Sequence, residues 1–292
     1  MRAGDRTGPA PRMTAARRGA NITMRARWGG LCGLAGLLAS AWVAGCAARI
    51  EDDQTLTIFA AASLAEVFQA VGDAHRQANP AAEIVFNFAA SDQLAQQLLA
   101  GSSADLFASA DQVQMQVAVD AGLVDEALRR VFARNRMVIV VPSDNPAAIA
   151  SLADLARPGV RLVLAAPEVP AGHYARLILA RASADAAYGP GFEPAVLANV
   201  RSLEENVRAV LAKVVLGEAD AGIVYLTDAL TTGRGEAFAI EIPSGLNAVT
   251  EYWIAPLSGG THPEQAEEFL VTLLSAEGQS ILARYGFEPV GP

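Results

Sequence analysis

The sequence predicts an α/β fold with parallel-type sheets and helices on both faces. Strand-like and helix-like segments alternate along the chain beyond about residue 55, an order that is typical of parallel sheets joined by helices. Apolar runs such as MVIVV (137–141) and GIVY (222–225) are continuous rather than alternating, as expected for strands covered on both faces. Apolar residues recur at helical spacing along 203–216, and the length allows one large domain or two medium ones.

The individual elements follow from local patterns in chain order. The runs TLTIF (55–59) and EIVFNF (83–88) favour strands, and each stops at small residues before Ser63 or Ser91, where a helix is expected to begin. Further strands are expected at 105–109, 137–141, 161–165, 221–225, 238–242 and 251–257. Further helices are expected at 112–121, 151–156, 172–183, 203–216, 263–274 and 277–285, and the most loop-like connection at 183–194.

The N-terminal region has the three parts of a secretory signal peptide. A basic stretch that ends at Arg27 precedes a short apolar stretch, and small residues precede Cys46. The tetrapeptide VAGC (43–46) resembles the lipobox of bacterial lipoproteins, which predicts removal of residues 1–45 and lipidation of Cys46. Met24 gives a leader of more usual length than the first methionine does. The expected location is the periplasm or the cell surface, with the lipid as membrane anchor.

The expected mature chain is strongly acidic. Removal of residues 1–45, which hold seven arginines and one aspartate, leaves 247 residues with 15 basic and 30 acidic side chains. A net charge of −15 argues against binding to nucleic acid. Cys46 is the only cysteine left, so no disulfide is expected and stability must come from core burial.

Two expected helix starts are the leading candidates for a binding site. A serine at a helix start lies beside backbone N–H groups that have no acceptor within the helix, and the helix dipole directs positive potential to the same place. If the starts at Ser63 and Ser91 lie near one another, they form an anion site that needs no lysine or arginine. The alternative is that Ser63 and Glu66 form a capping box that serves only the helix.

The sequence contains no strong catalytic or metal-binding motif. It has no HExxH pair, GxSxG elbow, P-loop or GxGxxG turn, and its three histidines lack zinc-ligand spacing. A binding protein without cofactor or bound metal cation is therefore expected, and not an enzyme. The enzymatic alternative is a secreted serine hydrolase that uses Ser63 or Ser91 with His173.

Five segments stand in order along nearly all of the expected mature chain. They are FAAASL (59–64), FAASDQLAQQLLAGSSADLFASADQ (88–112), PEVPAGHYA (167–175), NVRAVLAKVVLGEADAGIVYLTDA (206–229) and RYGF (284–287). Together they resemble the periplasmic molybdate-binding proteins of bacterial ABC transporters. The resemblance implies a two-lobed periplasmic-binding-protein fold with the ligand cleft between the lobes. It places one lobe at about 50–133 plus 247–292 and the other at about 134–246.

The same resemblance implies five ligand-binding residues. Ser63 and Ser91 match serines that bind an oxyanion through hydroxyl and backbone N–H groups. Ala171 and Val207 match residues that offer a backbone N–H at a helix start, and Tyr225 matches a tyrosine that offers its hydroxyl. From the residue pattern alone, Val207 is expected to face the core and Tyr225 to end a buried strand.

The function that the resemblance implies is capture of molybdate and its delivery to an ABC permease, by a monomer. Tungstate or another tetrahedral oxyanion such as sulfate is the alternative ligand. A sensor or structural lipoprotein that feeds no transporter is the alternative role. Asp92, next to Ser91, departs from the family pattern, because an inward carboxylate would repel a dianion and would favour protonated phosphate.

Overall fold

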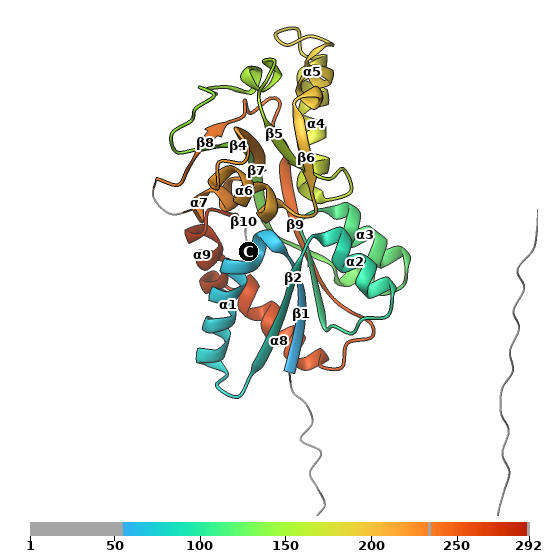
Figure 1. Cartoon of the computed structure of the whole chain (residues 1–292). Coiled ribbons are helices and arrows are strands. Elements are labelled where there is room, and N and C mark those ends of the chain that lie inside the picture. Colours follow the sequence, from blue (N-terminus) through green and yellow to red (C-terminus); the bar gives the residue numbers. More distant parts are fainter. Residues whose placement is uncertain (1–54, 233–234, 291–292) are drawn as a thin grey trace, which may run out of the picture. The chain divides into compact units, whose positions relative to one another are not determined.

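The computed structural model describes residues 55–232 and 235–290 (Figure 1). The expected signal peptide at 1–45 and the expected lipid site at Cys46 lie outside the described residues, so both stay predictions. Within the described ranges, none of the helices has the length and apolar character needed to cross a membrane.

Helices and strands alternate along the described chain, as the sequence predicts. The strands are β1 (Thr55–Ala61), β2 (Glu83–Ala89), β3 (Leu106–Ser109), β4 (Arg130–Pro142), β5 (Leu162–Ala165), β6 (Val200–Glu204), β7 (Ala221–Tyr225), β8 (Ala237–Glu241), β9 (Val249–Pro256) and β10 (Glu288–Pro289). The α-helices are α1 (Ala65–Ala78), α2 (Ser91–Leu99), α3 (Gln112–Asp120), α4 (Pro170–Ala184), α5 (Phe192–Ala198), α6 (Val207–Val215), α7 (Leu226–Leu230), α8 (Pro263–Leu274) and α9 (Ala276–Arg284). The 3₁₀ helices are η1 (Ala62–Leu64), η2 (Glu126–Leu128) and η3 (Leu152–Ala156).

The strands form two sheets that share the long strand β4. The first has the order β2-β1-β3-β9-β4 and the second β4-β7-β5-β6, with β8 and β10 also paired to β4. β1 pairs in parallel with β2 and β3, as β5 does with β6 and β7. β4 and β9 instead run antiparallel to their neighbours. The prediction of parallel-type sheets is wrong for these two strands, because β4 passes through both sheets for 13 residues and β9 returns beside it.

Helices cover both faces of the first sheet. On one face, Phe68 of α1 packs against Phe132 and Phe269, with ring centroids 5.6 and 5.9 Å apart. On the other face, α2 and α3 bury Leu94 and Met115 in the same cluster as Phe107 of β3. Strand side chains point alternately to the two faces, so a single short strand contributes to the packing against the helices on both faces.

The helix predicted at 203–216 begins later than expected. Leu203 lies in β6 and is 49% exposed, although its spacing from later apolar residues fits a helix. The helix starts at Val207 because Asn206 caps it: the Asn206 side chain accepts a hydrogen bond from Ala209 N at 2.9 Å. The Asn206 cap thus decides where the helix begins, although Leu203 matches the apolar periodicity.

α4 begins in close contact with the segment that follows β5 because residue 172 is a glycine. A Cβ atom at Gly172 would lie 1.9 Å from the carbonyl oxygen of Ala166 and 2.5 Å from that of Ala165. Only glycine allows this approach, which fixes the position of the first turn of α4.

We expect Gly172→Ala to lower the free energy of unfolding by about 1–3 kcal/mol, the usual cost of forcing extra atoms into a packed site. Urea denaturation without ligand measures this change. Gly191→Ala is the matched control, because Gly191 has a φ of −84° and no atom near its added Cβ within 4 Å. The control should change stability by less than about 0.5 kcal/mol. Equal losses in both variants would contradict the packing argument.

Candidate anion-binding site

A small pocket lies where strands of both sheets end and helices begin. It is lined by Ala61, Ala62, Ser63, Ala90, Ser91, Ala110, Val169, Pro170, Ala171, Asn206, Val207 and Tyr225. None of these lining side chains carries a charge. The cavity volume is about 10 Å³, far below the roughly 300–1,000 Å³ of pockets for drug-sized ligands. The pocket therefore suits a small ligand.

The structure brings all five residues that the sequence predicted for the site to this pocket. Ser63 lies in η1 directly after β1, and Ser91 is the first residue of α2. Ala171 and Val207 lie in the first turns of α4 and α6, and Tyr225 is the last residue of β7. Ligands in α/β sheets usually bind at these carboxyl ends of strands.

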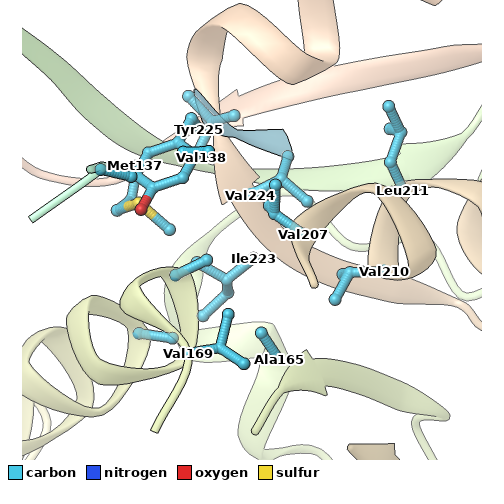
Figure 2. Packing of buried hydrophobic residues seen from close by; sticks show 14 of the residues in the cluster. Met137, Val138, Ala165, Val169, Val207, Val210, Leu211, Ile223, Val224 and Tyr225 are labelled. Carbon is cyan, nitrogen blue, oxygen red and sulfur yellow. The ribbon is translucent and has the colours of Figure 1, made fainter. Parts of the chain in front are cut away.

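Three helix starts direct main-chain N–H groups toward the pocket. The first N–H groups of α2, α4 and α6 have no acceptor within their helices, and each helix dipole adds positive potential there. No side chain caps α2 or α4, and the Asn206 cap of α6 serves Ala209 rather than Val207. Figure 2 shows the Val207 side chain in the same apolar cluster as Val224. Val207 thus faces the core, as its spacing predicts, while its backbone lies at the pocket.

Two hydroxyl groups at the pocket are arranged to donate hydrogen bonds. Ser91 Oγ accepts a hydrogen bond from Ala110 N at 3.0 Å, which leaves its own proton for another group. Tyr225 Oη is buried and has no hydrogen-bond partner within the described residues. Burial raises the pKa of Tyr225 well above its ordinary value, so the phenol keeps its proton.

Ser63 is not a helix cap. α1 begins at Ala65 without a side-chain cap, because a turn of 3₁₀ helix precedes it. The Ser63 hydroxyl lies 2.9 Å from Tyr252 Oη, and Glu66 forms an ion pair with Arg208. The capping-box alternative for Ser63 and Glu66 is therefore wrong.

Asp92 does not line the pocket. Burial of its carboxyl raises its pKa, and the nearby charge of Glu168 acts in the same direction. Backbone N–H groups at the start of α2 oppose this shift. The Asp92 carboxyl is thus not one of the groups that line the pocket.

Arg208 joins the segment after β1 to the segment after β7 beside the pocket. Its Nε lies 2.9 Å from Asp228 Oδ1 and 3.3 Å from the Ala62 carbonyl oxygen. Its other nitrogens contact Thr231 Oγ1 at 3.0 Å and Glu66. Burial raises the pKa of Asp228 to about 7, although Arg208 favours its ionised form. Arg208 and Asp228 both lie in segment 206–229, one of the five segments that carry the family resemblance, but no sequence signal showed that they pair.

The arrangement lacks the contacts of a serine hydrolase. Ser63 bonds to Tyr252 and Ser91 accepts from Ala110, and neither forms a hydrogen bond to His173 in the part of the chain that is described. The His173 ring packs against Tyr174 with centroids 5.6 Å apart. Among the described residues, no group of three His, Cys, Asp or Glu could hold a metal ion.

Known proteins resemble the chain over most of its length. A family model described as bacterial extracellular solute-binding protein matches residues 56–288. The molybdate-binding protein ModA of Mycobacterium tuberculosis H37Rv is 38% identical over 234 residues, which are 80% of this chain and 84% of that protein. ModA of Escherichia coli K12 is 34% identical over 263 residues, 87% of this chain and 95% of that protein.

A solved structure shows the same fold. The substrate-binding domain of a putative molybdenum ABC transporter from Clostridium difficile superposes with a TM-score of 0.61 at 26% identity, and the match covers 81% of this chain and 99% of that domain. The chain therefore belongs to the family of bacterial extracellular solute-binding proteins, with their two-lobed α/β fold, and within that family it is ModA-like.

Proposed function

We propose that the protein captures molybdate outside the cytoplasm and delivers it to the permease of an ABC importer. The observation that carries the proposal is a small pocket with no charged lining, surrounded by three helix starts and by serine and tyrosine hydroxyls. Such a set of donors fits an anion that has no proton to give. The relatives named for molybdate support this choice among the oxyanions.

In this proposal five residues hold the ligand oxygens. Ser63, Ser91 and Tyr225 donate from their hydroxyls, and Ala171 and Val207 donate from their backbone N–H groups. Hydrogen bonds to a charged acceptor are short and strong, and a site with little water strengthens them further. The protein performs no reaction on the ligand and needs no cofactor.

Transport follows from closure of two lobes over the anion. The proposed lobes are about 50–133 plus 247–292 and about 134–246, which both contribute residues to the pocket. An anion that contacts both lobes binds the closed state more tightly than the open one and therefore shifts the population toward closure. The closed monomer then presents the surface that the permease recognises.

Molybdate and tungstate should bind much more tightly than sulfate, and phosphate should bind worst near neutral pH. Sulfate is smaller, so donors held at the larger spacing form longer and weaker hydrogen bonds. Phosphate keeps a proton at this pH, and a pocket of donors leaves that O–H without an acceptor, at a cost of about 1–3 kcal/mol. Calorimetric titration with the four anions, followed by competition, measures the order. Equal or tighter binding of sulfate or phosphate would contradict the molybdate assignment.

Ser91→Ala should weaken molybdate binding by about 1.5–3 kcal/mol, the usual loss for a hydrogen bond to a charged group. The variant also leaves Ala110 N without its acceptor, so the ligand-free protein should lose about 1 kcal/mol of stability. Calorimetry and urea denaturation measure the two effects separately.

Ser102→Ala is the matched control, because Ser102 is exposed and does not line the pocket. It should alter neither affinity nor stability by more than about 0.5 kcal/mol. Unchanged affinity in Ser91→Ala together with a large loss of stability would show that Ser91 is structural and that the ligand binds elsewhere.

We also propose that a lipid on Cys46 anchors the protein to a membrane after removal of residues 1–45. Cys46→Ser should leave folding and molybdate affinity unchanged and should release the protein into the soluble fraction, because one lipid-bearing residue supplies the anchor. Fractionation of cells in high salt, with detection of the protein in each fraction, tests this. A variant that still sediments with membranes would rule out the lipid anchor at Cys46.

A further inference from the structure

A buried chain of polar side chains leads from the pocket to both long strands. Ser63 Oγ lies 2.9 Å from the hydroxyl of Tyr252 on β9. Asn135 on β4 lies near this hydroxyl, and its Nδ2 donates to Thr227 Oγ1 at 2.8 Å. All four side chains are buried, with exposed fractions of 4% for Ser63, 0% for Tyr252, 1% for Asn135 and 2% for Thr227.

The direction of the hydrogen bond between Ser63 and Tyr252 follows from their neighbours. Asn135 Oδ1 accepts from Arg136 N at 2.9 Å and its Nδ2 donates to Thr227 Oγ1, so the nearby amide oxygen already serves as an acceptor elsewhere. Within the described residues, Ser63 Oγ is then the acceptor left for the Tyr252 proton. If Ser63 donated instead, the tyrosine proton would be buried without an acceptor, which is unfavourable. Tyr252 therefore donates and Ser63 accepts.

We propose that Tyr252 is a positioning and specificity-determining residue that makes Ser63 a donor to the bound anion. This inference rests on the proposed function. With Tyr252 donating to Ser63 Oγ, the serine proton has no acceptor among the described residues other than a ligand in the pocket. Tyr252 occupies one of the two lone pairs of Ser63 Oγ, so the serine is left with its proton to donate and with a single lone pair.

Ser91 shares this bias, because its Oγ already accepts from Ala110 N. Tyr225 Oη has no partner within the described part of the chain, so its proton is also available to a ligand. Each of the three hydroxyls can therefore donate to the ligand, and each of the two serines has one lone pair already occupied. The ligand class that fits is a tetrahedral dianion without protons, and an anion that carries an O–H is rejected because its proton stays unpaired.

The test compares the affinities for molybdate and phosphate at pH 7 in the wild type and in Tyr252→Phe. Phenylalanine keeps the ring packing against Tyr225, Phe132 and Phe287, whose centroids lie 5.7, 6.2 and 5.3 Å away. It removes the proton that Ser63 Oγ accepts, so both lone pairs of the serine become available to accept the O–H of a protonated anion. We expect the ratio of the phosphate Kd to the molybdate Kd to fall about tenfold, a change of about 1.4 kcal/mol.

Two further variants separate this role from a structural one. In a Ser63→Ala background, Tyr252→Phe should leave the ratio unchanged within about twofold, because the residue that it positions is gone. Tyr188→Phe is the matched control, since Tyr188 packs on Phe192 with centroids 4.8 Å apart and does not line the pocket. If Tyr252→Phe does not fold, Tyr252→Leu removes the same hydroxyl and should lower the ratio in the same direction.

The possible results are distinguishable. Equal weakening of both anions in Tyr252→Phe, or a fall in the ratio that persists without Ser63, would overturn the proposal. A wild-type protein that binds sulfate but not molybdate would contradict the proposed function alone. In that case the same comparison of sulfate with phosphate still tests the role of Tyr252.

Discussion

An anion with two charges leaves water only if other groups replace its hydration shell, and this requirement governs the pocket. The lining contains no charged side chain, and in the proposed site the replacement comes from the starts of α2, α4 and α6 together with three hydroxyls. The main-chain donors keep their orientation within each helix, so little reorganisation of the helix starts themselves opposes binding. The nearby charge of Arg208 is shared between Asp228 and Glu66. Geometry rather than net charge therefore provides the attraction.

The arrangement of the strands holds the helix starts in place. Parallel strands such as β1 and β2 end at one edge of their sheet, so the segments that follow them begin close together. In the other sheet, the absence of a Cβ atom at Gly172 lets the start of α4 pack directly against the carbonyl oxygens of Ala165 and Ala166. β4 runs through both sheets, and β9 lies antiparallel beside it. Donors that come from different sheets are thus tied to the same continuous strands.

Local patterns in the sequence predicted the alternating fold and the two serines, because the residues that end a strand and start the next helix are neighbours in the sequence. Ala171 lies at a predicted helix start, whereas Val207 and Tyr225 came mainly from resemblance, since the residue pattern alone places both in the core. Tyr252 was missed because it lies 189 positions from Ser63 in the sequence. The mixed sheets and the capping-box error have the same origin: strand direction and hydrogen-bond partners are set by contacts between distant segments, which no local pattern contains.

The main-chain donors of the pocket have a consequence for its evolution. Substitution of Ala171 or Val207 changes the shape of the wall but leaves the N–H group in place, because every residue except proline carries one. Substitution there is limited by packing, because both side chains are buried in the core, and not by the need for a particular donor. Changes of ligand preference that act through hydrogen-bond direction are then expected at the three hydroxyls and at the side chains that orient them. We expect a related protein that binds a protonated anion to differ first at the residue that donates to Ser63, and not at the helix starts themselves.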